Sequence, residues 1–253
     1  MIGMIEKIGY MVNNYKLWNF NGVENLFAGV DLGTFGTKII IVDEKGLPRA
    51  ASMRRTEVVK SGLILDYIGA LNIVREMIEE IRSYCPHPIE KGASAYPPNT
   101  EIGNIETTKY ILEGADLEVL NITDEPSAAN NVLGIKNGAI VDIGGGTTGI
   151  AIIKDGEIIY RADEATGGIH ISLVLAGSLK ISFDEAEKIK TDKKMTKDIL
   201  PIVKPVIEKM ASIIDEFIKD YGFIEEICLV GGTCELEGFT EIIGEILNKK
   251  VFK

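Results

Sequence analysis

The sequence predicts an α/β fold of two lobes, and the main evidence is a segment that occurs twice. Val30–Thr34 (VDLGT) and Val141–Thr148 (VDIGGGTT) each join an apolar strand, an Asp and a Gly-rich turn, and their Asp residues are 111 positions apart. An apolar strand follows each turn, so each copy is predicted to form a β-hairpin. Helix and strand patterns alternate along the rest of the chain, as in α/β folds. A chain of 253 residues is long enough for a core in each lobe.

Each of the two turns is suited to binding phosphate. Glycine residues allow the backbone to come close to a ligand, and the N–H groups and hydroxyls of the turn can converge on phosphate oxygens. Two such turns that face each other would hold one polyphosphate. Asp31 and Asp142 would then lie beside the phosphates, where a carboxylate is tolerated if a cation such as Mg²⁺ separates the charges. The alternative for both Asp residues, capping of the turn, accounts less well for their paired occurrence.

Other phosphate-binding motifs fit these turns poorly. The segment Gly33–Lys38 (GTFGTK) lacks the Gly-Lys-Ser/Thr order of a P-loop. The P-loop and the dinucleotide-binding motif both place phosphate at the N-terminus of a helix, whereas both turns of this chain lead into a strand. The N-terminus of a helix is therefore not expected to be the main phosphate-binding group in this chain.

Composition limits the class of partner. The net charge is −11 and the pI is near 4.8, which disfavours nucleic acid and anionic membranes as partners. The densest basic stretch, Lys188–Lys197, is bordered by acidic residues and is predicted to be a solvated helix and loop. The three Cys residues lack C-x-x-C spacing and favour neither a metal site nor a disulfide framework. No apolar run approaches a membrane span and the first residues lack a secretory pattern, so a cytoplasmic protein is expected.

Three ranges are predicted along the chain: an N-terminal segment over 1–24, lobe one over 25–136 and lobe two over 137–253. In the N-terminal segment, apolar residues at helical spacing predict a helix. A helix packed on lobe one is favoured over an amphipathic helix that binds a partner, because helical periodicity usually reflects burial.

Lobe one is predicted to alternate helices and strands after its hairpin. A helix should begin at Asp66-Tyr67, present one apolar stripe to the sheet and end before Pro86. Another should start near Glu125, with Pro126 in its first turn, and end near Gly134. Between them the expected elements are a strand over 91–96, a loop over 97–99, a helix over 105–112 and a strand over 117–122.

Lobe two is predicted to continue its hairpin with a third strand and with helices that cover the sheet. The expected elements are a strand over 158–160, a turn at 167–168, a helix from 169, a helix over 184–189, a long helix over 201–217, a strand over 227–230 and a helix over 239–247. The long helix carries a broad apolar stripe. Gly231 and Gly232 directly follow the last strand, which predicts a third turn that faces the ligand.

Four motifs in this order resemble the actin, hexokinase and heat-shock-chaperone ATPase superfamily. They are Asp-x-Gly-Thr at 31–34, Glu-Pro-Ser-Ala-Ala at 125–129, Asp-x-Gly-Gly-Gly-Thr-Thr at 142–148 and Gly-Gly-Thr at 231–233. A closer resemblance, over roughly 27–248, is to the ethanolamine-utilization protein J (EutJ) family. It is carried by 141–152, 162–168 and 170–173, and it is strengthened by 124–126, 204–206 and 208–210. This resemblance implies a two-lobed actin-like ATPase fold of duplicated ribonuclease-H-like lobes, in a minimal version without the large lobe-one insertion.

The resemblance also implies roles for individual residues. Asp31 and Asp142 would hold Mg²⁺ through its waters, and Glu125 would orient or deprotonate the water that attacks the γ-phosphate. The residues implied to bind ATP or ADP are Gly33, Thr34, Lys38, Gly144, Gly145, Gly146, Thr147, Glu187, Lys190, Gly231, Gly232 and Thr233. Two alternatives stay open: Glu125 could simply suit a helix N-terminus, and Lys38 could be a solvent-exposed strand residue.

The function implied by the resemblance is that of an ATP-binding, ATP-hydrolysing, chaperone-like accessory protein of ethanolamine utilization, associated with a bacterial microcompartment. Its partners would be nucleotide and a protein client among the pathway enzymes or shell proteins, without nucleic acid or membrane. Glu235 at the position of an adenine-stacking Arg, and the end of the chain before a closing helix motif, predict low ATP affinity and slow turnover. A small-molecule kinase and an actin-like filament module are the alternatives.

Overall fold

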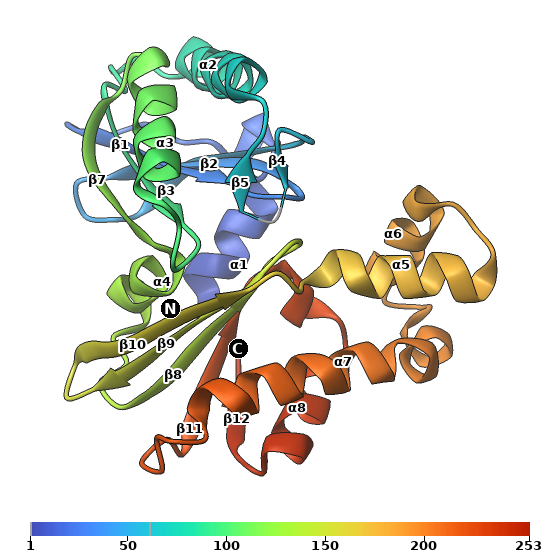
Figure 1. Cartoon of the computed structure of the whole chain (residues 1–253). Helices are drawn as coiled ribbons and strands as arrows, with labels where there is room; N and C mark the ends of the chain where they lie inside the picture. Colours follow the sequence, from blue (N-terminus) through green and yellow to red (C-terminus); the bar gives the residue numbers. More distant parts are fainter. Residues whose placement is uncertain (1, 61) are drawn as a thin grey trace. The chain divides into compact units, whose positions relative to one another are not determined.

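The computed structural model describes residues 2–60 and 62–253, which form two compact units. The first unit extends to Tyr96 and includes Thr100–Asp124, and the second comprises Pro97–Asn99 and Glu125–Lys253. Each unit contains one five-stranded sheet, coloured blue to green in the first unit and yellow-green to red in the second (Figure 1). Helix α4 (Glu125–Leu133), which the sequence analysis counted with lobe one, groups with the second unit.

The two sheets have the same topology, which is the structural form of the sequence repeat. The strand order is β3-β2-β1-β6-β7 in the first unit and β10-β9-β8-β11-β12 in the second. In each sheet the first three strands along the chain are antiparallel neighbours, and the other two join in parallel. The predicted α/β fold with a duplicated hairpin is therefore confirmed.

The first unit surrounds its sheet with helices and with the N-terminal segment. Met11 and Trp18 are buried in its core, and the Trp18 indole N–H donates to the Met11 carbonyl at 2.9 Å. The N-terminal segment is thus packed on this unit. The elements are α1 (Ile2–Met11), the 3-10 helix η1 (Tyr15–Leu17), β1 (Leu26–Leu32), β2 (Gly36–Asp43), β3 (Pro48–Arg55), β4 (Val59–Lys60), β5 (Leu63–Ile64), α2 (Tyr67–Tyr84), β6 (Lys91–Tyr96), α3 (Ile102–Gly114) and β7 (Glu118–Asp124).

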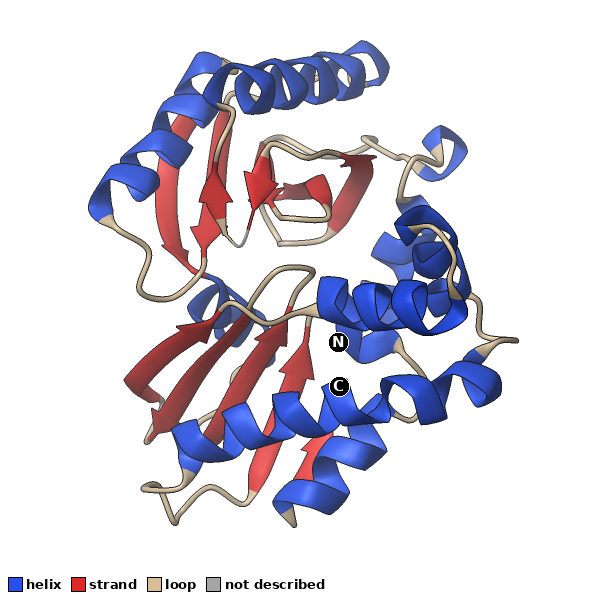
Figure 2. Ribbon diagram, turned by 45° about the vertical axis from the view of Figure 1, so that its right-hand side comes forward, coloured by secondary structure: helices blue, strands red, loops and turns tan. Residues whose placement is uncertain are grey.

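The second unit buries apolar side chains on both faces of its sheet. Val141 and Ile150 belong to a large core with the long helix α7, which lies along the sheet in Figure 2, whereas Ile140 and Cys228 pack toward α4. Apolar residues at successive strand positions are expected when both faces are covered. Besides α4, the elements are β8 (Gly138–Ile143), β9 (Thr148–Lys154), β10 (Glu157–Glu164), α5 (Gly168–Leu179), α6 (Phe183–Thr191), α7 (Thr196–Ile218), β11 (Glu226–Val230), the 3-10 helix η2 (Gly232–Glu235), α8 (Phe239–Leu247) and β12 (Lys250–Phe252).

Several boundaries differ from the sequence predictions. Helix α7 begins at Thr196, before the predicted start at Pro201, because buried Ile199 and Val203 anchor its first turns and keep Pro201 inside the helix. Strand β10 is longer than the predicted 158–160 because its whole length pairs with β9. The short strands β4, β5 and β12 and the 3-10 helix η1 were not predicted. Segments of two or three residues are too short to show a periodic pattern.

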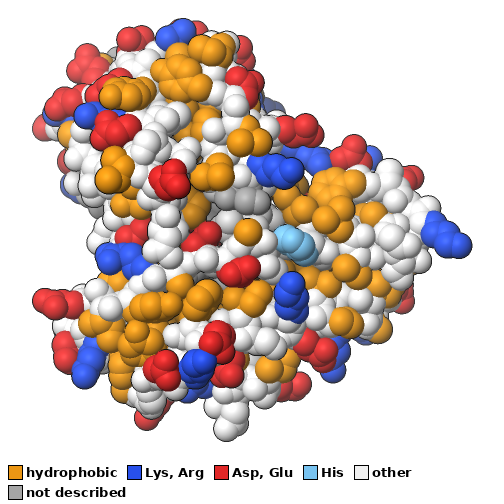
Figure 3. All heavy atoms as spheres, viewed as in Figure 1, with side chains coloured by type: hydrophobic (Ala, Val, Ile, Leu, Met, Phe, Trp, Pro, Cys, Tyr) orange, Lys and Arg blue, Asp and Glu red, His pale blue; other side chains and the backbone are white. Residues whose placement is uncertain are grey.

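Charged side chains of both signs lie on the surface. On the face drawn in Figure 3, Lys and Arg side chains are interspersed with Asp and Glu. Among the described residues, no helix combines the length and the apolar composition needed to cross a membrane.

Candidate functional site

The first turn joins β1 to β2 in the first unit. Its backbone is closed by two hydrogen bonds of 3.2 Å between Gly33 and Gly36, each residue donating to the carbonyl of the other. A Cβ atom on Gly36 would lie 2.4 Å from the Arg54 carbonyl oxygen, so glycine is required there by the neighbouring strand. The Thr34 hydroxyl accepts a 3.4 Å hydrogen bond from the N–H of Gly62, in the small β4–β5 hairpin. The β4–β5 hairpin thus supports the first turn through this hydrogen bond.

An ion pair lies beside the first turn. Asp31 on β1 is directly opposite Lys38 on β2, and the Lys38 Nζ is 2.5 Å from the Asp31 Oδ2. Each side chain is 46% exposed, so solvent screens the attraction and the pair adds little to folding stability. Both groups are therefore accessible to a ligand. The exposure of Lys38 agrees with both interpretations considered for it in the sequence.

The second turn has the same construction in the second unit. The N–H of Gly144 donates to the Thr147 carbonyl at 3.0 Å, which closes four residues between the paired Ile143 and Thr148. The first turn likewise has four residues between its paired strand ends. Hairpins of equal length thus follow the two Asp residues, as the repeat in the sequence predicted.

The second turn is held more tightly than the first. The start of α5 packs on it, because the N–H groups of Gly168 and Ile169 donate to the carbonyls of Gly144 and Gly145 at 2.9 and 2.8 Å. A Cβ atom on Gly167 would lie 2.7 Å from the Gly145 carbonyl oxygen, so this contact requires glycine. The turn is consequently fixed from outside its own hairpin.

The third predicted turn also contacts the second one. Gly231 has φ +93°, and a Cβ atom there would lie 2.4 Å from the Asp142 Oδ1. The Thr233 hydroxyl donates to the Gly144 carbonyl at 2.8 Å. Thr233 thereby supports the turn, a role that the sequence did not suggest. The structure brings Asp142 and these two Gly-rich turns together within one unit.

A carboxyl group that the sequence analysis did not single out lies beside the second turn. The Thr147 hydroxyl hydrogen-bonds to Asp163 of β10, while the other carboxyl oxygen, Oδ1, is buried without a partner in the described part of the chain. Burial is the main reason that the pKa of Asp163 rises from 3.8 to about 7, and the charge of Asp142 adds to it. Asp163 stands in the 162–168 stretch that carried the family resemblance, which was the available signal.

Glu187 and Lys190 form a buried cluster on α6. The Lys190 Nζ lies 2.6 Å from the Glu187 Oε1, 2.8 Å from the Ser172 hydroxyl oxygen and 3.1 Å from the Gly168 carbonyl oxygen. Glu187 is only 4% exposed, and its second oxygen, Oε2, is buried without a hydrogen-bond partner among the described residues. Through Gly168, this cluster is connected by hydrogen bonds to the second turn.

Glu125 is the first residue of α4, directly after β7 ends at Asp124. Its side chain is half-buried, and Pro126 stands in the first helical turn as predicted. A carboxylate at this end of a helix is stabilised by the helix dipole, so the placement alone does not decide between the two interpretations of Glu125.

The carboxylate beside the second turn is of the kind that a hydrated magnesium ion uses. In residues 2–60 and 62–253 no group of three or more His, Cys, Asp or Glu side chains could hold a metal ion. Mg²⁺ usually keeps several waters and uses one or two carboxylates. Asp142, at the end of the strand that leads into the second turn, offers a carboxylate of that kind.

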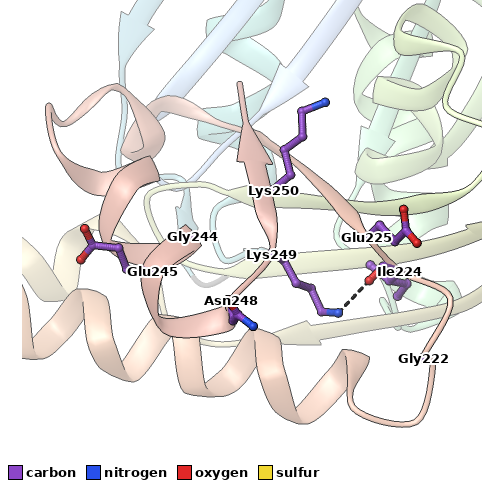
Figure 4. Close-up of a pocket in the computed structure, with 8 residues that line it drawn as sticks. All are labelled: Gly222, Ile224, Glu225, Gly244, Glu245, Asn248, Lys249 and Lys250. Atoms are coloured by element: carbon purple, nitrogen blue, oxygen red, sulfur yellow. Dashed lines mark hydrogen bonds between the residues drawn. The ribbon is translucent and has the colours of Figure 1, made fainter.

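A pocket of about 430 Å³ lies at the opposite end of β11 from Gly231. Figure 4 shows its lining, in which the Lys249 Nζ donates to the Ile224 carbonyl oxygen at 2.7 Å. The pocket includes none of the residues expected to bind nucleotide, and it is distinct from the candidate site.

The duplicated sheets and their Asp-Gly turns define an actin-like ATPase fold. MreB 5 of Spiroplasma citri, a structure bound to AMPPNP, matches with a TM-score of 0.73 at 17% identity, over 90% of this chain and 91% of that chain. The family model for the type IV pilus assembly protein PilM matches residues 126–252.

The chain belongs to the EutJ family of ethanolamine utilization proteins. EutJ of Escherichia coli (strain K12) is 42% identical over 217 residues, which cover 86% of this chain and 76% of the relative. The crystal structure of EutJ from Carboxydothermus hydrogenoformans matches with a TM-score of 0.90 at 42% identity, over 99% of this chain and 92% of that chain. The predicted family and fold are thus confirmed.

Proposed function

We propose that the protein binds ATP with Mg²⁺ through its two Asp-Gly turns, one from each unit, and hydrolyses the nucleotide slowly. The observation that carries this proposal is the repeated turn, with the same length and the same closing hydrogen bond after each Asp. Equivalent groups from two units suit a ligand that combines several phosphates with a metal ion. MreB 5 of Spiroplasma citri, which has this fold, has been solved with AMPPNP and with ADP.

In this proposal the turns bind the phosphates and the two Asp residues hold the ion through its waters. Thr34 and Gly33 in the first unit, and Gly144–Thr147 in the second, offer backbone N–H groups and hydroxyls. Lys38 binds the β-phosphate, and its exposed pair with Asp31 can open at little cost. The magnesium ion supplies neutralisation of the phosphate charge.

The nucleoside end of ATP is assigned to the second unit. The buried Glu187 Oε2 has no hydrogen-bond donor within the part of the chain that the structure describes, and a ribose hydroxyl would supply one. Lys190 holds the other Glu187 oxygen and so fixes the direction of the carboxylate. Gly232 leaves room for the nucleoside, because a Cβ atom there would meet nothing within 4 Å, whereas Gly231 allows close packing against Asp142. Thr233 contributes by supporting Gly144.

Glu125 is assigned to the hydrolytic step. A carboxylate that accepts a proton from the attacking water would orient this water toward the γ-phosphate, and positioning of this kind supplies much of the catalysis in phosphoryl transfer. The Glu125→Gln variant should keep its affinity for ATP and lose at least about tenfold in phosphate release.

Release of inorganic phosphate at saturating ATP is the measurement, with Glu118→Gln, an exposed carboxylate on β7, as the matched control. Equal rates in the wild type and in Glu125→Gln would remove the assigned role. Transfer of the phosphate to an added small molecule, instead of release, would replace the ATPase assignment by a kinase.

The cellular role that we propose is a chaperone-like accessory of ethanolamine utilization at a bacterial microcompartment, in the cytoplasm. Membership of the EutJ family supports the pathway. A client would be an enzyme or a shell protein of that pathway. The test is the recovery of a chemically denatured pathway enzyme with the protein and ATP. Recovery should exceed that with ATP and Glu125→Gln, and equal recovery would contradict an ATP-driven chaperone role.

A further inference from the structure

Helix α5 exposes apolar side chains along one face. Leu173 is 54% exposed and Val174 is 38% exposed, and Gly177 is also exposed. With the half-buried His170 they occupy positions i, i+3, i+4 and i+7, which lie on the same side of a helix. The opposite side of α5 packs against α6 and α7 within the core of the second unit. The residues His170, Leu173, Val174 and Gly177 are named the α5 face.

The α5 face lies in a part of the chain that carries no charge. Residues 165–179 are the longest stretch of this sequence without Asp, Glu, Lys or Arg. Helix α7 of the same unit differs, because Lys, Asp and Glu occupy most of its exposed positions, as is usual for the side of a helix that meets water. Apolar surface without charge is typical of the central part of a protein–protein interface. The composition of the α5 face therefore favours a protein as its partner.

The residues of the α5 face fit a second copy of the same face. Two α5 helices can lie antiparallel, related by a two-fold axis that passes between Leu173 and Val174. Leu173 of each copy is then opposite Val174 of the other, and His170 is opposite Gly177. A Cβ atom on Gly177 would meet nothing within 4 Å, so the space over this glycine can receive the larger imidazole. A contact of this kind is isologous, as in other two-fold dimers.

Charges at the two ends of α5 complement each other in the same arrangement. Glu164 is exposed on the N-terminal side of the helix, and the exposed Lys180 follows its last residue. An antiparallel pair brings Lys180 of each copy to the Glu164 end of the other, which gives two attractive contacts. A parallel pair would instead bring Lys180 to Lys180. The attractive contacts oppose the general repulsion between two chains of net charge −11.

We propose that the α5 face is a self-association surface through which two copies of this chain form an antiparallel helix pair. One 12-residue helix from each copy offers less area than the roughly 800 Å² per partner of a standard interface. The dimer is therefore weak and forms at protein concentrations on the order of 100 µM. This contact needs no nucleotide, so the inference goes beyond the proposed function and is tested without ATP.

The first test places a charge at the centre of the pair. Leu173→Glu should weaken the dimer at least about tenfold, because burial would remove the new carboxylate from water. Leu65→Glu is the matched control, since Leu65 is 66% exposed and lies in the first unit. Sedimentation equilibrium of the full chain, up to about 500 µM, should show a dimer for the wild type and for the control. A monomeric wild type would reject a second copy as the occupant and point to a different protein, and an unchanged dimer of Leu173→Glu would reject the α5 face.

The second test exchanges the charges at the ends of the helix. Lys180→Glu and Glu164→Lys should each weaken the dimer about threefold at low salt, because each variant brings like charges together. The double variant restores opposite charges and should return to within about twofold of the wild type. Both sites are exposed, so these changes leave the core of the second unit intact. Single variants that dimerise like the wild type, or a double variant weaker than both single variants, would overturn the antiparallel arrangement.

Discussion

The two turns share a backbone and differ in what surrounds them. Both close four residues with the same hydrogen bond, but the first is supported by Gly62 of a small hairpin, whereas the second is held by Gly168, Ile169 and Thr233. Their charged neighbours differ as well. An Asp31–Lys38 ion pair lies beside the first turn, whereas two carboxylates, Asp142 and Asp163, lie beside the second. The two copies thus share a backbone frame, whereas the side chains around them differ in contacts and in charge.

The largest expected effect concerns the tighter support of the second turn. Gly231→Ala should lower the free energy of unfolding by about 3 kcal/mol, because the alanine would need φ +93° and its Cβ would collide with Asp142. Urea denaturation measures this loss. Gly232→Ala is the matched control, since a Cβ atom there meets nothing within 4 Å, and it should cost less than about 1 kcal/mol. Equal losses in the two variants would show that the second turn is not held by this contact.

The raised pKa of Asp163 predicts a pH dependence of stability. Burial, with the nearby carboxylates, raises the pKa of Asp163 from 3.8 to about 7. Between these values the folded protein holds a proton that the unfolded chain has released, so the free energy of unfolding falls as the pH rises through this window. In EDTA, the wild type should therefore lose stability relative to Asp163→Asn from the acidic to the neutral side. Parallel profiles in urea denaturation would contradict the raised pKa.

The smallest effect is expected at the ion pair of the first unit. Lys38→Ala should change the free energy of unfolding by at most about 0.5 kcal/mol, because both partners are half-exposed and screened. The affinity of this variant for ATP should nevertheless fall, because Lys38 is proposed to bind the β-phosphate. A large stability loss without a change in affinity would make Lys38 a structural residue.

The sequence predicted the fold well because the repeat and the periodic patterns are local signals. Strand β6 and helix α8 have the predicted bounds, and the two hairpins lie where the Asp-Gly motifs stand. The site was predictable only in part. The pairing of Glu187 with Lys190 follows from helical spacing, but the burial of Asp163 depends on strands and loops that pack around it, which one sequence pattern does not encode. The hydrogen bond from Thr233 to the Gly144 carbonyl likewise arises from tertiary packing.

The central claim is that both units contribute to one site for ATP and Mg²⁺. Calorimetric titration of the protein with ATP and MgCl₂ tests it most directly, with Asp31→Ala and Asp142→Ala as variants from the first and second unit. The account predicts binding at a single site per chain in the wild type and a strong loss of affinity in each variant. No binding by the wild type, or unchanged affinity in either variant, would contradict it.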